Sequence, residues 1–287
     1  MKEFLRKIYY SILKILPAKL VINIENIFTY KRPLKKNKIE YFGEKIQWMK
    51  LHGNLQKYNN YVDKYLVRDY VKEKIGEEYL IPLLGVYEDV SEIDYSKLPK
   101  SFVLKANHGS GYNIIVKDKS KSNFSKINKK LSKWLKEDYY KIKKEYQYQN
   151  VKKKITCEKF IQDKNNQLLD YKFFCFDGKP AFVKVDFDRY ENHKVNFYDM
   201  DWNLLEMQEA GWENYTEKYE KPENFDLMQE LTNKLCEDFQ FVRVDLYNAD
   251  GKIYFGELTF TPASGKHAFV PLEKDIKIAK GIRIENE

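Results

Sequence analysis

Residues 242–259 read VRVDLYNADGKIYFGELT, and this stretch decides the fold that we expect. Two runs of alternating apolar and polar residues flank the turn signal at residues 248–251, which indicates an antiparallel hairpin. Because side chains alternate with a period of two along each strand, the pattern predicts Asp245 and Glu257 at the same end of the sheet. Paired carboxylates that are withdrawn from water need a cation, and hard oxygen ligands favour Mg²⁺.

The surroundings of this pair favour a binding site over a plain surface hairpin. Arg243 stands two residues before Asp245, and the small polar loop at residues 261–265, TPASG, follows the second strand. Spacing alone is equally typical of a solvated hairpin with ordinary surface acids. Both interpretations stay open at this point.

Composition and charge restrict the class of protein but do not identify its binding partner. The chain has 287 residues, with 51 Lys plus Arg against 43 Asp plus Glu and a formal net charge of +8. This balance suits an anionic partner, although a general enrichment in lysine gives the same sum. Three widely spaced cysteines predict neither a disulfide framework nor a zinc site, so we expect a cytoplasmic protein.

Periodicity along the chain predicts an α+β fold. Helical spacing dominates the first 100 residues, including an amphipathic helix at residues 1–16 that either packs on the domain or lies on an anionic membrane. A lysine-rich helical stripe follows at residues 131–142, and one long helix at residues 225–239. Strands are expected at residues 102–105, 113–116, 155–161, 171–176, 181–185, 194–198, 241–247 and 253–260.

A glycine-rich hairpin joins the first two of these strands. Its loop contains Gly109, Ser110 and Gly111 and follows Lys105, so free backbone N–H groups and one cation could meet phosphate oxygens. The loop opens into a strand and lacks the Gly-Lys-Ser/Thr signature, which excludes a P-loop. His108 lies in the same loop.

The order of these motifs resembles the ATP-grasp enzymes, in the branch related to the teichuronopeptide biosynthesis protein TupA. The resemblance covers residues 41–281 and is carried by Asp63-Lys64, by Lys105 before the hairpin, by Glu158-Lys159-Phe160-Ile161, by Arg243-x-Asp245 and by Glu257-x-Thr259. It implies two α+β subdomains that grip ATP. It also implies that the helical N-terminal region replaces the Rossmann-like domain usual in the superfamily.

The resemblance implies a role for each matching residue. Lys64 and Lys105 would bind ATP phosphates, Gly109 to Gly111 would close over them as a flap, and Glu158, Lys159, Phe160 and Ile161 would form the hinge beside the nucleoside. Apart from the resemblance, the position of His108 in the flap makes it a further candidate for a phosphate contact. Asp245 and Glu257 would hold Mg²⁺ and Arg243 would face the transferred phosphoryl group. Thr259 stands where many members of the family have asparagine as a further metal ligand.

We therefore expect an ATP- and Mg²⁺-dependent carboxylate-amine ligase that acts through an acyl phosphate. Residues 1–100 form the predicted helical region, residues 101–157 the small subdomain and residues 158–287 the large one. The expected substrate is an acidic glycan or peptide precursor, such as a uronic acid that receives an amino acid, with peripheral contact at the inner face of the membrane and no nucleic acid. Lys172, Asp186, Asp188 and Arg189 either reach the acceptor and phosphates or form ordinary ion pairs.

Two other functions fit parts of the sequence. The DxD patterns at residues 186–188 and 199–201 are typical of glycosyltransferases that bind sugar nucleotides, although the second also indicates a hairpin turn. A non-catalytic module that binds RNA or acidic glycan through the lysine-rich helix is the third interpretation.

Overall fold

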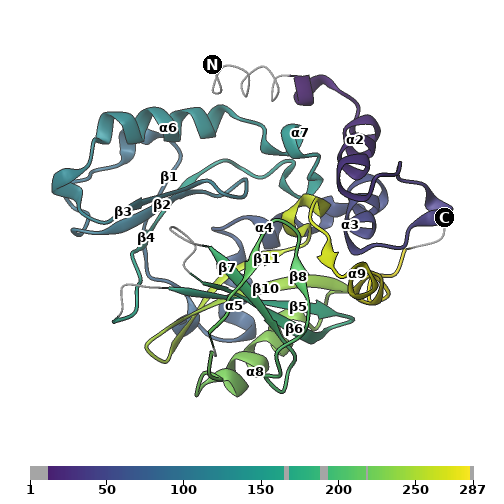
Figure 1. Ribbon diagram of the computed structural model, residues 1–287. Coiled ribbons are helices and arrows are strands. Elements are labelled where there is room, and N and C mark those ends of the chain that lie inside the picture. The colour runs from purple at the N-terminus through teal and green to yellow at the C-terminus, as the bar shows by residue number, and fades with distance from the viewer. Residues whose placement is uncertain (1–11, 165–167, 188–192, 218, 285–287) are drawn as a thin grey trace.

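The computed structural model describes residues 12–164, 168–187, 193–217 and 219–284. These form a small lobe around a four-stranded sheet, a large lobe around a six-stranded sheet, and N-terminal helices that lie beside both (Figure 1). The α-helices are α2 Ala18–Tyr30, α3 Phe42–His52, α4 Asn59–Val62, α5 Val67–Lys74, α6 Phe124–Lys136, α7 Tyr139–Lys143, α8 Phe225–Cys236 and α9 Leu272–Ala279. The short 3-10 helices are η1 Lys36–Lys38, η2 Leu55–Tyr58, η3 Glu77–Tyr79, η4 Val90–Glu92, η5 Lys119–Lys121, η6 Tyr146–Tyr148 and η7 Pro262–Gly265.

The strands divide between the two lobes and one small two-stranded sheet. They are β1 Leu83–Tyr87, β2 Phe102–Ala106, β3 Asn113–Val116, β4 Ile155–Lys159, β5 Leu169–Phe176, β6 Lys179–Phe187, β7 Lys194–Tyr198, β8 Gln208–Glu209, β9 Glu213–Asn214, β10 Phe241–Ala249, β11 Lys252–Thr259 and β12 Phe269–Val270. The small-lobe order is β1-β4-β2-β3 and the large-lobe order is β11-β10-β5-β6-β7-β9, while β12 pairs with β8. All these pairs are antiparallel except β7 with β9.

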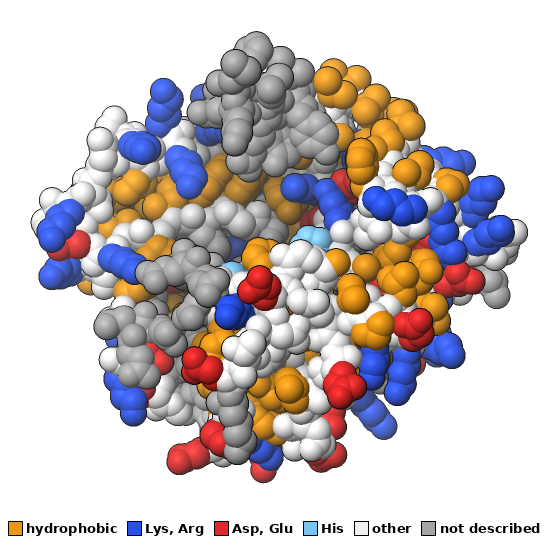
Figure 2. Space-filling model, viewed as in Figure 1, with side chains coloured by type: hydrophobic (Ala, Val, Ile, Leu, Met, Phe, Trp, Pro, Cys, Tyr) orange, Lys and Arg blue, Asp and Glu red, His pale blue; other side chains and the backbone are white. Residues whose placement is uncertain are grey.

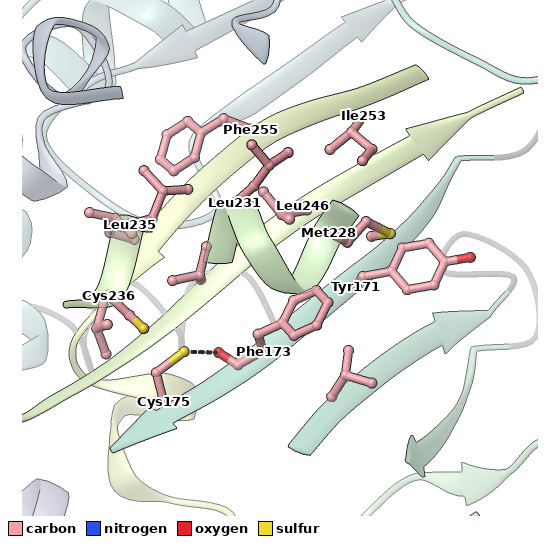
Figure 3. Close-up of a cluster of buried hydrophobic side chains, with 14 of the residues drawn as sticks. Tyr171, Phe173, Cys175, Met228, Leu231, Leu235, Cys236, Leu246, Ile253 and Phe255 are labelled. Carbon is pink, nitrogen blue, oxygen red and sulfur yellow. Dashed lines mark hydrogen bonds between the residues drawn. The ribbon is translucent and has the colours of Figure 1, made fainter. Parts of the chain in front are cut away.

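The face of the large-lobe sheet that α8 covers is apolar, because its strands alternate. In β10, Val242, Val244 and Leu246 are fully buried on the face that α8 covers. Figure 3 shows Met228, Leu231 and Leu235 of α8 packed among Phe173, Leu246 and Phe255 of the sheet. Each fully buried side chain of this size contributes about 1.5–3 kcal/mol. The opposite face carries the charged residues together with a second apolar cluster, in which Phe174 and Phe241 of the sheet pack with Phe42 of α3.

The small lobe repeats this arrangement on a smaller scale. The helix α6 begins where the side chain of Asn123 accepts a hydrogen bond from the Lys126 N–H, at 2.9 Å, as expected of an N-cap. Leu131 and Trp134 of α6 pack with Phe102 and other apolar residues of the sheet. Lysines occupy the remaining faces of α6, so this lysine-rich segment is an amphipathic helix on the sheet.

Two adjacent strands join the lobes. Just before β1 the chain passes Leu80, which belongs to the large-lobe core, and β4 leads back toward the large lobe at Lys159. These segments are bonded to each other, since Leu83 pairs with Glu158 and the Lys159 N–H donates to the Pro82 carbonyl at 2.9 Å. The two lobes are thus joined by two chain segments that are hydrogen-bonded to each other.

A buried charged cluster ties the N-terminal helices to the large lobe. The ammonium of Lys50 on α3 lies 3.5 Å from the Glu25 carboxylate on α2 and donates to the Ser264 hydroxyl at 3.0 Å. Ser264 belongs to η7, five residues after β11 ends. The helices therefore support the loop that follows the predicted metal-binding strand.

Most predicted elements are present, and the α+β class is confirmed. The strands around residues 102–116, 155–159, 169–187, 194–198 and 241–259 match, and the helix predicted at residues 225–239 ends at Cys236. The small-lobe sheet also takes in β1, from the segment that we assigned to the helical region. Of the amphipathic helix predicted at residues 1–16, residues 12–15 are helical and residues 1–11 lie outside the described part.

Candidate active site

Asp245 and Glu257 lie directly opposite each other on β10 and β11. A bulge follows Asp245, and the glycine at 256 makes the close approach possible: a Cβ there would meet the Asp245 carbonyl oxygen at 2.9 Å. The hairpin pattern at residues 242–259 thus brings the two carboxylates together as expected.

Arg243 binds both carboxylates from the same face of the sheet. Its guanidinium donates to the two Asp245 oxygens at 2.7 and 2.6 Å, and its Nη2 also donates to Glu257 Oε1 at 3.2 Å. The Thr259 hydroxyl accepts from the same nitrogen at 3.1 Å and donates to Glu257 Oε1 at 2.9 Å. Oxygen atoms of Asp245, Glu257 and Thr259 therefore converge on the guanidinium of Arg243.

The two carboxylates differ in their electrostatic setting. Burial raises the pKa of Asp245 to about 7 against the opposing charge of Arg243, and the nearby carboxylate of Asp170 adds to the rise. Burial would also raise the pKa of Glu257, but Arg243, Lys64 and the Thr259 hydroxyl hold it below its ordinary value. Glu257, whose side chain is 38% exposed, is the more firmly ionised member of the pair.

Charged side chains continue across the polar face of the sheet. Lys172 pairs in register with Asp245, is buried, and binds Asp170 at 2.6 Å and also Asp186. Lys184 contacts Asp186 at 3.3 Å and also Glu209. The catalytic role predicted for Lys172 stays a prediction, and its observed contacts are with these acids.

This row of charges ends at a histidine. Glu209 accepts a hydrogen bond at 2.7 Å from Nδ1 of His267, whose side chain is 38% exposed. Although burial opposes it, the bonds from His267 and Lys184 hold the pKa of Glu209 at about 2. The ionised carboxylate of Glu209 therefore orients the imidazole of His267.

Lys64 and Lys105 bring positive charge to the same cleft from two other elements. Asp63 accepts a hydrogen bond from the Tyr65 N–H at 2.8 Å and shapes the turn that carries Lys64. Burial lowers the pKa of Lys64, while the Glu257 carboxylate opposes the fall. Lys105, on β2, forms an ion pair with Glu158 on β4. The structure thus gathers Lys64, Lys105, Glu158 and Glu257, which lie far apart in the sequence.

The glycine-rich loop closes over this region. The ammonium of Lys64 donates to the carbonyl of Gly109, while Ser110 and Gly111 are exposed at the tip. Gly111 has a φ of +74°, which a residue with a side chain rarely adopts. The loop therefore contacts Lys64, a residue of the cleft, and its role as a phosphate-binding flap stays a prediction.

The His108 side chain points elsewhere. Its imidazole is 2% exposed, and Nε2 donates to the carbonyl of Trp134 at 2.9 Å inside the small lobe. Burial lowers the pKa of His108 to about 4, so the ring is neutral at pH 7. The phosphate contact predicted for His108 stays a prediction, and in this structure the ring serves the packing of the flap.

The predicted hinge residues lie at the lobe junction. The carboxylate of Glu158 lines the cleft, whereas the side chain of Lys159 is exposed and its backbone extends the sheet. Phe160 and Ile161 follow the strand and are half-buried.

A cleft that is open to solvent lies between the two lobes' charged residues. Its empty volume, open solvent included, is about 480 Å³. One part is charged, with Lys64, Lys105, Glu158 and Glu257; another is apolar, with Val62, Val67, Leu80, Ile81, Phe255 and Leu258. Arg68 and Tyr148 also line it. Sequence analysis missed these two, because no local pattern marks a residue that only tertiary packing brings to the site.

The donor set fits Mg²⁺. Asp245, Glu257 and Thr259 offer only hard oxygen ligands, which this ion prefers, and a cation from Arg243 already lies where they converge. Within the described residues no group of three or more His, Cys, Asp and Glu side chains is arranged to hold a metal ion, and the metal-binding role of Asp245, Glu257 and Thr259 stays a prediction.

The described parts of the DxD patterns serve structural purposes. Asp186 is 2% exposed and bound by Lys172, Lys184 and the His193 imidazole, the last at 2.8 Å. Asp199 caps a turn by accepting hydrogen bonds from the Asp201 and Asn203 N–H groups. Asp188 and Arg189 lie outside the described residues.

Two α+β lobes around a cleft that is lined by Lys64 and Lys105 and lies beside paired carboxylates are typical of the ATP-grasp class. The family model described as TupA-like ATPgrasp matches residues 44–283, and the chain belongs to this family. The predicted ATP-grasp fold and family are therefore confirmed.

Solved structures give more distant similarity. D-alanine–D-alanine ligase from Bacillus anthracis is 17% identical, with a TM-score of 0.46 over 74% of this chain and 62% of that one. L-amino acid ligase from Bacillus licheniformis is 14% identical, with a TM-score of 0.43 over 73% and 45%. The chain thus spans less than two thirds of either ligase. A comparison with curated protein sequences finds no match.

Proposed function

We propose that the protein is an ATP- and Mg²⁺-dependent ligase that joins a carboxylate to an amine. The observation that carries the proposal is the convergence of Asp245, Glu257 and Thr259 on Arg243, in register across β10 and β11. Lys64 and Lys105 line the same cleft as Glu257. This combination suits a polyphosphate with a divalent cation.

The cleft has matching regions for the two ends of a nucleotide. Lys64, Lys105 and the flap backbone would bind phosphate oxygens, and Asp245, Glu257 and Thr259 would hold Mg²⁺. The apolar lining from Val62, Leu80 and Ile81 is suited to a purine ring, with Glu158 as an acceptor beside it. The fit requires Lys105 to exchange its ion pair with Glu158 for phosphate.

The chemistry that we propose needs no protein nucleophile. A substrate carboxylate oxygen attacks the terminal phosphorus of ATP, ADP leaves, and the amine then displaces phosphate from the acyl phosphate to form an amide. Bound Mg²⁺ would neutralise the phosphate charge. Arg243 and the two lysines stabilise the transferred group, and closure of the flap excludes water.

We further propose that His267 accepts the proton that the attacking amine must lose. Its Nδ1–H is held by Glu209, which leaves Nε2 as the acceptor. The ring lies at the end of the charged row that begins with Asp245 and Lys172. A half-exposed, oriented imidazole is well suited to a general base.

For the acceptor we propose an acidic cell-surface glycan or peptide precursor, in which a uronic acid receives an amino acid. The family that the chain belongs to supports this class, and the net charge of +8 suits an anionic substrate. We expect the enzyme to act in the cytoplasm.

The test is Mg²⁺-dependent ATP binding by calorimetry, on the wild type and on Asp245→Asn and Glu257→Gln variants. We expect binding by the wild type, loss in both variants, and ADP release with suitable uronic and amino acid pairs. Binding of a UDP-sugar in place of ATP would overturn the proposal. Thermal unfolding of each variant separates loss of binding from loss of folding.

A further inference from the structure

The helix α2 is apolar on two opposite faces. Its inner face buries Val21 and Ile22, which are at most 1% exposed and pack toward α3. Its outer face carries Leu20, Ile24, Ile27 and Phe28, which are 41–74% exposed. On a helix, residues spaced by three, four, seven and eight form one stripe, so the outer residues make a continuous apolar surface.

The preceding segment adds to this apolar surface. Residues 12–15 are helical, and Ile12 and Ile15 are 50% and 85% exposed. The outer stripe of α2 comprises Leu20, Ile24, Ile27 and Phe28, and Ile12 and Ile15 add exposed apolar side chains just before this helix. Figure 2 shows hydrophobic side chains gathered over α2, at the upper right. A face of this kind is costly in water and indicates a partner.

Positive charge surrounds the outer stripe. Between residues 12 and 39 the chain has seven basic residues, Lys14, Lys19, Lys31, Arg32, Lys35, Lys36 and Lys38, and a single acid, Glu25. Glu25 is buried on the inner face and bound by Lys50 and Lys266. All six lysines are exposed, whereas the neighbouring acid Glu40 pairs with Arg32, so the exposed surface of this region carries a net positive charge beside its apolar stripe.

We propose that the outer stripe of α2 docks on an anionic lipid bilayer. An apolar stripe flanked by lysines, on a helix that lies flat on the protein, fits the boundary between headgroups and acyl chains. None of the helices in the described residues has the length and apolar character needed to cross a bilayer, so the contact is peripheral. A second copy of the chain is disfavoured, because it would bring two cationic surfaces together.

Docking at α2 also places the active site near the lipid surface. The Thr29 hydroxyl on the inner face of α2 donates to the Lys266 carbonyl at 3.1 Å, and the Glu25–Lys50–Ser264 contacts join the same two regions. The loop thus held to α2 lies between Thr259 and His267. Only the helix α2 would then separate the membrane from the loop between Thr259 and His267.

The proposal is tested by co-sedimentation of the full chain with vesicles of phosphatidylcholine alone or mixed with phosphatidylglycerol. We expect binding to the anionic vesicles that weakens with salt. The Ile24→Ser/Phe28→Ser variant is expected to reduce the partition about tenfold or more. Lys14→Gln/Lys19→Gln/Lys31→Gln should reduce binding to anionic vesicles and leave any binding to neutral ones unchanged.

A matched control removes apolar surface elsewhere. Leu227→Ser/Leu272→Ser changes two residues that are 39% and 44% exposed, on α8 and α9, and should leave the partition unchanged. Unfolding midpoints and ATP binding verify that each variant is intact. Equal binding by the wild type and the α2 variant would overturn the proposal. So would a concentration-dependent dimer that the α2 variant abolishes, without vesicle binding by the wild type.

Discussion

The carboxylates of Asp245 and Glu257 share one nitrogen of Arg243, at 2.6 and 3.2 Å. A guanidinium thus neutralises the pair that we propose to hold Mg²⁺. Metal and arginine compete for the same oxygen atoms, and this competition gives the first prediction.

Arg243→Gln should destabilise the protein by about 3 kcal/mol in the absence of divalent cations, because it leaves buried Asp245 without its counter-charge. Mg²⁺ should then raise the unfolding temperature of the variant more than that of the wild type. Thermal unfolding with Mg²⁺ and with EDTA measures both effects. An equal response of the two proteins to Mg²⁺ would count against a metal site at Asp245.

Lys64→Met and Lys105→Met should each weaken ATP binding by roughly 10- to 100-fold, as expected for loss of a charged contact to phosphate. Calorimetry measures the affinity. Lys129→Met is the matched control, since this lysine belongs to the same lobe as Lys105, on α6, but its side chain is exposed. A loss of similar size at Lys129 would mean that general positive charge, and not the two cleft lysines, governs affinity.

Thr259→Val should weaken Mg²⁺-dependent ATP binding and cost about 1–2 kcal/mol of stability, because the hydroxyl links Arg243 to Glu257. Thr259→Asn restores a neutral oxygen ligand, and we expect it to bind Mg²⁺ at least as well as the wild type. Titration of ATP binding against Mg²⁺ concentration distinguishes the variants. Wild-type metal dependence in Thr259→Val would exclude the hydroxyl from the donor set.

His108 should make stability fall in mild acid. Its pKa is about 4 in the folded protein, below its ordinary value of about 6.5, so between these values the unfolded chain binds more protons. The stabilisation is complete above pH 6.5 and is lost as pH falls toward 4, by about 3 kcal/mol.

Urea unfolding at several pH values measures this loss. His108→Gln keeps a donor for the Trp134 carbonyl but does not titrate, so its profile should be flatter over the same window. His52→Gln, at an exposed position, is the control. If the wild type and His108→Gln lose stability in parallel, another group is responsible.

The hairpin at residues 242–259 could be predicted because its information is local. Alternation and an Asp-Gly turn set the register that pairs Asp245 with Glu257. The strand β1 was not predicted, since Leu83–Tyr87 is short, contains a glycine and finds its partner more than 60 residues later in β4. Short apolar runs of this kind do not distinguish strand from helix.

The row of charged residues on the large-lobe sheet could not be predicted from local sequence patterns either. Lys172, Asp186 and Glu209 come from three strands, and only the sheet order β5-β6-β7 and the adjoining β8 bring them together. Asp170 could have been found, because it stands two residues before Lys172 on the same strand face. The inward turn of His108 depends on packing against α6, which no motif encodes.

The two hydrogen-bonded chain segments that join the lobes restrict how the cleft can open. A single connecting strand would let the small lobe swivel about its axis, but β1 and β4 are bonded side by side through Leu83 and Glu158. Such a ribbon bends across its plane more easily than within it. We therefore expect the small lobe to close by bending of this two-segment junction, a movement that would bring Lys105 and the Gly109 loop toward the carboxylates with little rotation about the strand axis.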